Sequence, residues 1–378
     1  MPGCLAHGLG PGEGSSIVSI LPIRAALFPL LGTREACSLR GVCHELKQAV
    51  ADFPWEDMGT VIWGSIAQWR ACFPRAIGAN VGVSGRRTPV VDGDFVHFVG
   101  LRALNMSWCR EVTDAAFVHL RGIEKLDMNY CWQGTITDAA FAHLAGIQRL
   151  SILGCHQTTI TDAAFMHLKG IKVLNMSCCK QLTDAAYENL RGVHTLLMWC
   201  CNQATITDAA FMHLKGIQEL DMSGCDQATI TDSAFVHLVG IQRLSIWGCR
   251  QATVTDAAFL HLRGIKVLNM SHCTQLTGAA FEHLKGIHTL LMWSCPQTTI
   301  TDAAFEHLKG IHSLDMHGCD QDTITGAGLE HLKGISRLGM ADCTDEAIAA
   351  AESLDLPVAK RKYTHYGALN TSFVEAGQ

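Results

Sequence analysis

The chain has 378 residues, a net charge of −6 at pH 7 and charged side chains at 17% of its positions, against about 25% in an average soluble domain. This low, slightly acidic charge argues against nucleic acid or an anionic membrane surface as the main partner. No segment reaches the roughly 18 uninterrupted apolar residues of a membrane span. The apolar run at 17–31 contains Pro22 and Arg24 and lacks the basic start of a secretory signal. We therefore expect a cytoplasmic or nuclear protein whose 17 cysteines are reduced.

The amino-terminal part differs in composition from the rest of the chain. Residues 1–16 are rich in Gly and Pro and are expected to be disordered. Residues 17–58 are expected to form a short helical segment, and residues 59–89 a connecting and capping region in which Trp69 to Val81 is a degenerate first strand. So short a helical segment has too small a core to bury all its apolar residues, and some of them must contact another surface. These residues are Leu21, Pro22, Phe28, Leu31, Leu39, Val42 and Cys43.

A repeat of 22 or 24 residues fills residues 90–355 about eleven times. A period of roughly 20 to 29 residues carrying L-x-x-L-x-L-x-x-C marks a leucine-rich repeat, in which one short strand and one helix form each turn of a solenoid. One turn cannot bury its apolar face alone, so the turns must stack. The predicted fold is an α/β horseshoe with parallel strands inside and helices outside. The cysteines that mark the repeat are Cys109, Cys131, Cys155, Cys179, Cys201, Cys225, Cys249, Cys273, Cys295, Cys319 and Cys343.

The sequence of each repeat predicts the same strand and helix. Leu174 and Met176 alternate with polar residues, as in a half-buried strand. Thr161 and Asp162 suit the start of a helix, where Thr caps free amides and Asp faces the positive end of the dipole, and Gly170 suits its end. The residues expected to stack as an aromatic ladder are Phe117, Phe141, Phe165, Phe211, Phe235, Phe259, Phe281 and Phe305, with Tyr187 and Leu329 as substitutes. Residues 356–378 are expected to be a C-terminal cap or a tail.

The strand residues beside the inward positions point to the concave side of the horseshoe. Trp and Arg are frequent anchors of protein interfaces, so we predict a partner-binding surface there. Because parallel strands lie about 4.8 Å apart, tryptophans on alternate strands should be roughly 10 Å apart. Alternatively, neighbouring side chains or the C-terminal tail cover the rings. The predicted surface consists of Trp199, Trp247, Trp293, Leu197, Leu291, Arg149, Arg243, Asp221 and Asp315.

A block of four turns recurs 94 residues later. Two explanations are open: the block was copied recently, or a ligand binds a row of surface residues that the block repeats. No residue set predicts catalysis, because the sequence offers no nucleophile–base pair, phosphate-binding loop or paired acids. Ten histidines share one helix position without a Cys or carboxylate to complete a metal site. We expect neither an enzyme nor a cofactor. Cys178 and Cys200 share a position in adjacent turns, within disulfide range, and are a candidate redox pair or two unreactive thiols.

The order of these segments resembles a known family. From Phe28 to Cys43 the apolar spacing resembles an F-box, with Leu21 and Pro22 as its opening Leu-Pro, although Leu46 stands where a tryptophan is expected. An F-box followed by cysteine-type repeats resembles the F-box/leucine-rich-repeat proteins. The resemblance implies that the seven apolar residues of the helical segment bind a Skp-type adaptor of a cullin–RING ubiquitin ligase. It also implies that the solenoid recruits a protein substrate, whose identity the sequence does not reveal.

Other interpretations of the helical segment and of the whole chain remain open. The segment can simply cap the open apolar end of the solenoid. The chain as a whole can be a structural or scaffolding repeat protein with no ligase link, or a sensor that binds a small molecule in its groove. The fold alone does not choose among these functions.

Overall fold

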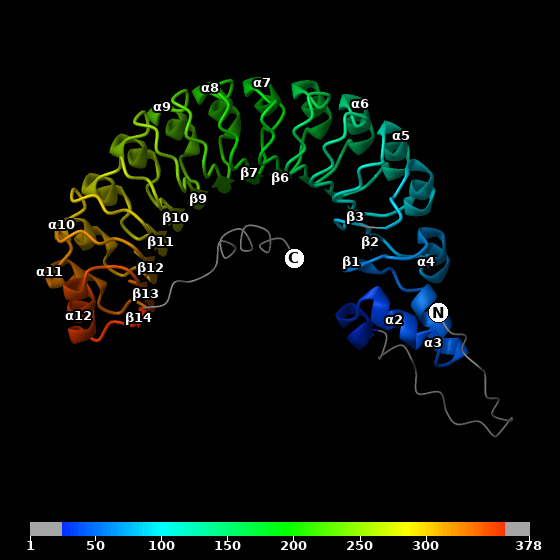
Figure 1. The fold of residues 1–378 in the computed structure, drawn as a ribbon, viewed down its shortest axis with the longest axis horizontal. Coiled ribbons are helices and arrows are strands. Elements are labelled where there is room, and N and C mark those ends of the chain that lie inside the picture. Colours follow the sequence, from blue (N-terminus) through cyan, green and yellow to red (C-terminus); the bar gives the residue numbers. More distant parts are fainter. Residues whose placement is uncertain (1–24, 86, 360–378) are drawn as a thin grey trace.

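The computed structural model describes residues 25–85 and 87–359. Within them, fourteen strands form one parallel sheet whose strands follow the order of the chain. The chain curves into an arc with the strands on its inner side and the helices on its outer side (Figure 1). This confirms the predicted α/β solenoid of leucine-rich repeats.

Most strands are only three residues long, and from β2 onward neighbouring strands pair without a shift in register, whereas the pairing of β1 with β2 is irregular. Leu174, for example, lies opposite Leu150 on one side and Leu196 on the other. The strands are β1 (Glu56–Val61), β2 (Gly78–Asn80), β3 (Ala103–Asn105), β4 (Lys125–Asp127), β5 (Arg149–Ser151), β6 (Val173–Asn175), β7 (Thr195–Leu197), β8 (Glu219–Asp221), β9 (Arg243–Ser245), β10 (Val267–Asn269), β11 (Thr289–Leu291), β12 (Ser313–Asp315), β13 (Arg337–Gly339) and β14 (Val358–Ala359).

The outer side carries short helices, and one turn of α-helix is often followed by one turn of 3₁₀-helix (η). The α-helices are α2 (Thr33–Leu39), α3 (His44–Ala51), α4 (Ile66–Cys72), α5 (Asp114–Phe117), α6 (Asp138–Phe141), α7 (Asp184–Tyr187), α8 (Asp208–Phe211), α9 (Asp232–Phe235), α10 (Asp302–Phe305), α11 (Gly326–Leu329) and α12 (Asp345–Ser353). The 3₁₀-helices are η1 (Phe28–Leu30), η2 (Asp92–Phe98), η3 (Val118–Leu120), η4 (Ala142–Leu144), η5 (Asp162–Leu168), η6 (Met212–Leu214), η7 (Val236–Leu238), η8 (Asp256–His261), η9 (Gly278–His283), η10 (Glu306–Leu308) and η11 (Glu330–Leu332).

Every turn buries the same set of side chains. Leu174, Met176 and the eight phenylalanines of the predicted ladder are fully buried, and Tyr187 and Leu329 take the ladder position where Phe is absent. Gly170 follows η5 with a φ of 86°, the left-handed conformation that glycine adopts at least cost. The core of the solenoid is therefore the one that the sequence predicts.

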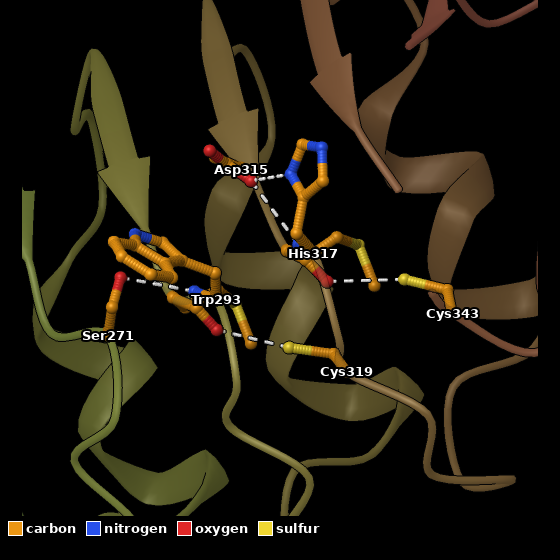
Figure 2. Close-up of polar contacts among 8 residues, drawn as sticks. Ser271, Trp293, Asp315, His317, Cys319 and Cys343 are labelled. Carbon is orange, nitrogen blue, oxygen red and sulfur yellow. Dashed lines mark hydrogen bonds and ion pairs between the residues drawn. The ribbon is translucent and has the colours of Figure 1, made fainter. Parts of the chain in front are cut away.

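The repeat cysteines also bond one turn to the turn before it. The Cys225 thiol donates to the Met198 carbonyl oxygen at 3.0 Å. Cys319 and Cys343 make the same bond to the preceding methionine carbonyls (Figure 2). Burial raises the pKa of Cys249 to about 12, so thiols of this kind stay protonated and unreactive near neutral pH. All eleven are buried except Cys343, which is half-buried near the end of the sheet.

A second ladder runs along the start of the helices. The Asp208 carboxylate accepts the backbone N–H of Thr231 in the next turn at 2.7 Å and its hydroxyl at 2.6 Å. The sequence interpretation of these aspartates as helix-start charges therefore missed their second role, which joins neighbouring turns. Where Gly278 replaces the aspartate, Thr301 makes no capping bond with its side chain. The bonded pairs are Asp92–Thr113, Asp114–Thr137, Asp138–Thr161, Asp162–Thr183, Asp184–Thr207, Asp208–Thr231, Asp232–Thr255, Asp256–Thr277 and Asp302–Thr325.

The sheet extends further at both ends than the predicted limits of the solenoid, 90 and 355. At the amino-terminal end, β1, α4 and β2 precede residue 90 and pair in sequence with β3. Helices α2 and α3 then cover the edge beyond β1 (Figure 1). At the other end α12 leads into β14, which pairs with β13. None of the helices in the described part of the chain has the length and apolar character of a membrane-spanning segment.

Candidate partner-binding face of the sheet

The three predicted tryptophans lie on the concave face of the sheet. Trp199, Trp247 and Trp293 each come two residues after a strand, β7, β9 and β11 respectively, and all three are half-buried. The residue before each of them is a fully buried methionine or isoleucine. Because successive side chains of an extended segment point to opposite faces, the tryptophans point away from the core.

Two of these rings and a histidine form a cluster. The ring centroids of Trp247 and Trp293 are 6.3 Å apart, and the His272 ring lies 5.9 Å from the first and 5.2 Å from the second. The predicted spacing of about 10 Å is therefore wrong for this pair. Ser271, in the turn after the intervening strand β10, is small enough to let the rings approach, and its hydroxyl accepts the backbone N–H of Trp293 at 3.1 Å (Figure 2).

Charged groups border this cluster on both sides. Arg243 pairs with Glu219 at 3.4 Å, yet the pKa of Glu219 is raised, because burial outweighs the attraction of Arg243. On the other side Asp315 pairs with His317 (Figure 2). Burial, and secondarily the nearby Arg250, lowers the pKa of His272, so this ring is neutral at physiological pH. The face therefore offers neutral aromatic surface between polar flanks of mixed sign.

Two residues of the predicted surface prove to be buried. Leu197 is 6% exposed and Asp221 only 3%, so neither offers a partner useful contact area. Asp221 accepts the backbone N–H and the hydroxyl of Ser223, at 3.0 and 2.5 Å, between Leu197 and Ser245 in register. Burial raises the pKa of its carboxyl in spite of these bonds. The remaining predicted residues, Leu291 and Arg149 among them, are half-buried.

In the helical segment the structure contradicts the prediction for Phe28. This ring is fully buried and packs against Phe53 and Trp55, each at a centroid distance of 5.2 Å. It is therefore core and not adaptor surface. Val42 and Cys43 are exposed, whereas Leu31 and Leu39 are half-buried against the core. Leu21 and Pro22 lie outside the described residues.

Cys178 and Cys200 lie side by side in the turns after β6 and β7. Both have a left-handed backbone, with φ of 62° and 57°, and their thiols share a hydrogen bond. Burial raises the pKa of both thiols, although both remain half-buried. Redox activity of the pair stays a prediction. No group of three or more metal-binding side chains comes together within residues 25–85 and 87–359.

A second aromatic cluster escaped the sequence analysis. The Trp108 ring, which follows β3, contacts the rings of Tyr130 and Trp132, which follow β4. The available signal was the repeated placement of aromatic residues directly beside Cys109 and Cys131, where other turns carry small or polar residues.

Comparison with known proteins identifies the fold but assigns the chain to no protein family. No protein-family model matches the chain, and no curated protein matches its sequence. The structure resembles TLR13 in a complex with the single-stranded RNA ssRNA13, with a TM-score of 0.51, 16% identity, and coverage of 75% of this chain and 49% of TLR13. It resembles Toll from the Drosophila Toll–Spatzle complex with a TM-score of 0.51, 15% identity, and coverage of 71% and 39%.

A third solved structure, the yeast Rad7–Elc1 complex, gives a TM-score of 0.43 at 14% identity and covers 83% of this chain and 95% of the other. That similarity is too weak to support an argument. This chain spans less than half of the TLR13 and Toll chains that it matches. TLR13 and Toll are leucine-rich-repeat proteins, and at this level of identity the likeness concerns the fold alone. The chain is therefore a leucine-rich-repeat solenoid, a fold suited to binding other molecules along its inner face.

Proposed function

We propose that the protein is a receptor that binds a protein partner on the concave face of its sheet and presents it to a ubiquitin ligase. The observation that carries the proposal is the cluster of Trp247, His272 and Trp293, half-buried rings that follow three neighbouring strands. Large aromatic side chains near the centre of a surface are the commonest anchors of protein interfaces. A parallel sheet holds them rigidly, so little side-chain entropy is lost when a partner binds.

The borders of the cluster suggest the chemistry of the partner. Glu219 and Arg243 on one side carry both signs of charge, and on the other side the Asp315 carboxylate contacts the His317 ring. We therefore expect a partner segment with apolar side chains at its centre and polar groups of either sign at its ends.

Substitution of the cluster tests this part of the proposal. The full-length protein and its Trp247→Ala and Trp293→Ala variants serve as baits, and the protein lost from both variants is then studied by calorimetry. Each substitution should weaken its binding by about 1–4 kcal/mol while changing stability little. Leu260→Ala, a change of an exposed residue on the outer face, is the matched control and should leave binding unchanged.

Loss of fold must be separated from loss of contact. Phe211 is fully buried, so Phe211→Ala should cost about 3–5 kcal/mol of stability. If the tryptophan variants unfold as readily as Phe211→Ala, their rings belong to the core. If they recover the same partners as the wild type, the concave face is not the binding surface.

The link to a ubiquitin ligase rests on the F-box-like spacing of the helical segment. With Phe28 in the core, we propose that a Skp-type adaptor contacts the apolar residues that the segment leaves exposed. These are Leu30, which is 80% exposed, and Val42, which is 68% exposed. Large apolar side chains that a small helical unit leaves exposed are typical of a contact surface.

Binding of a purified Skp-type adaptor tests the ligase link. Leu30→Asp and Val42→Asp should each weaken binding at least tenfold, because each places a charge in an apolar contact. Both should leave thermal stability almost unchanged. Phe28→Ala is the contrasting variant, since it should melt the segment. Failure of the intact chain to bind the adaptor would refute the ligase link. It would not bear on the proposed binding of a partner to the concave face.

A scaffolding role is the second candidate, and one observation favours it. The backbone N–H and the hydroxyl of Thr33 donate to Asp57 at 2.5 and 2.9 Å, and Arg40 donates to the Cys72 carbonyl at 2.5 Å. These bonds join the helical segment to the first turns of the solenoid, as a cap requires. A cap without adaptor binding would leave a repeat scaffold whose concave face holds a structural partner.

A further inference from the structure

Four rings in the turns after β3, β4 and β5 form a continuous aromatic surface, which we call the aromatic ridge. They are the rings of Trp108, Tyr130, Trp132 and His156. Trp108 stacks on Tyr130 with centroids 4.4 Å apart and planes inclined by 24°. Trp132 meets the Trp108 ring edge-on at 6.0 Å, and His156 lies 5.5 Å from Trp132. The ridge therefore spans the three consecutive turns that follow β3, β4 and β5, four to six strands away from Trp247, which follows β9.

The backbone shows that two of the four rings, Trp108 and Tyr130, occupy positions better suited to glycine. Trp108 and Tyr130 have φ of 67° and 58°, in the left-handed region that favours glycine. The equivalent positions of four other turns hold Gly154, Gly224, Gly248 and Gly318. Bulky aromatic residues at such a position need a compensating use, and packing into the core is not that use, since Trp108 and Tyr130 are only half-buried.

An arginine lies against the ridge with its hydrogen-bonding groups unused. The guanidinium carbon of Arg110 is 4.2 Å from the Trp132 ring centroid and 5.2 Å from that of Trp108, within the range of cation–π attraction. Within residues 25–85 and 87–359 the side chain makes no ion pair or hydrogen bond. Arg250, at the same position of a later turn, instead bonds to His272. Arg110 is thus an exposed cation that two rings hold in place.

A cavity of about 220 Å³ opens beside this arginine. Apolar side chains and polar groups share its walls, and its volume exceeds the ~150 Å³ that is enough to hold a benzene ring. Glu111 also lines it, which disfavours the entry of a second acidic group. The residues that matter to the argument are Val81, Val83, Pro89, Val90, Trp108 and Arg110.

We propose that this corner binds a peptide segment of a protein partner in which an acidic residue stands close to an apolar one. The carboxylate pairs with the Arg110 guanidinium, whose planar fork matches two carboxylate oxygens. The apolar side chain enters the cavity, and the intervening backbone crosses the ridge. Because the rings already fix Arg110, binding loses little side-chain entropy. The site is independent of the Trp247 cluster and of the ligase link.

Fluorine NMR of the full chain labelled with fluorotryptophan tests the proposal. The probes are two blocked tetrapeptides, Glu-Gly-Phe-Gly and Gln-Gly-Phe-Gly, which differ only in charge. Trp108→Phe and Trp132→Phe assign the two resonances of the ridge. The Glu peptide should shift these two resonances and leave those of Trp247 and Trp293 in place. The Gln peptide should bind about tenfold or more weakly, because it forms no charge-assisted pair.

Arg110→Gln should weaken binding of the Glu peptide about tenfold and abolish the preference over the Gln peptide. Arg250→Gln, the matched change in the later turn, should alter neither. The unshifted tryptophan resonances show whether each variant is folded. Equal binding of both peptides, or a preference that survives Arg110→Gln, overturns the proposal. So does the absence of any shift up to about 5 mM peptide, where even a millimolar Kd gives most of the effect.

Discussion

The carboxylate of Asp208 joins two neighbouring turns, and its removal tests whether such links hold the solenoid together. One oxygen accepts the Thr231 backbone N–H at 2.7 Å and the other accepts its hydroxyl at 2.6 Å. Hydrogen bonds to charged groups contribute about 1.5–3 kcal/mol each, and solvent screening at this half-buried site reduces that value. Asp208→Ala should therefore lower the apparent free energy of unfolding by about 2–3 kcal/mol.

Urea unfolding followed by circular dichroism measures this loss, and hydrogen exchange at the Thr231 amide locates it. Asp208→Asn keeps one carbonyl oxygen for the N–H and should lose about half as much. Asp226 is an exposed acid of the following turn, and Asp226→Ala should stay within about 0.5 kcal/mol of the wild type. Equal losses for Asp208→Ala and Asp226→Ala, or unchanged exchange at Thr231, would refute the ladder as a source of stability.

Two further predictions concern buried ionisable groups. Burial raises the folded-state pKa of Asp221 above its ordinary 3.8, so the folded chain keeps a proton that the unfolded chain has lost, and this contribution to stability falls as pH rises above about 4. Asp221→Asn should remove this pH dependence of stability and stabilise the protein at neutral pH. Urea unfolding of the wild type and the variant from about pH 4 to pH 7 measures both effects. Free energies of unfolding that change with pH in the same way in both proteins would contradict the prediction. The oxidant diamide should link Cys178 to Cys200 before it reaches any core cysteine, and faster at alkaline pH because burial raises both thiol pKa values. Peptide mapping checks this, and a core cysteine modified first would speak against it.

The fold was predictable because its determinants recur along the chain. The spacing around residues such as Met176 and Cys179 gives the strand, the inward face and the stacking of turns at once. The hydrogen bonds that join neighbouring turns could not be predicted. The partner of Asp208 lies 23 residues away, and only the register of the stacked turns brings Thr231 to it. The start of the sheet at Glu56 was missed for a related reason, since β1 and β2 lack the repeat's leucine and cysteine pattern.

The candidate sites were predictable in location but not in detail. The position of Trp247 and Trp293 on the concave face follows from alternation along each strand. Their close approach depends on the small Ser271 between them and on side-chain rotation, which spacing does not specify. Likewise, the spacing that marks Phe28 as apolar does not say whether it faces a partner or the neighbouring Trp55.

The duplicated block separates the scaffold from the surface that it displays. Its two copies, 94 residues apart, repeat the buried leucines and cysteines of each turn. On the concave face and its edge they differ, with Leu153 in one copy where the other has Trp247, and Cys178 where the other has His272. The two copies therefore do not repeat one row of surface residues, and the cluster of Trp247, His272 and Trp293 exists in only one of them. Because the turns join through buried and backbone groups, surface positions can change while the stacking persists. The binding chemistry of this chain thus lies in the positions at which its turns differ from one another.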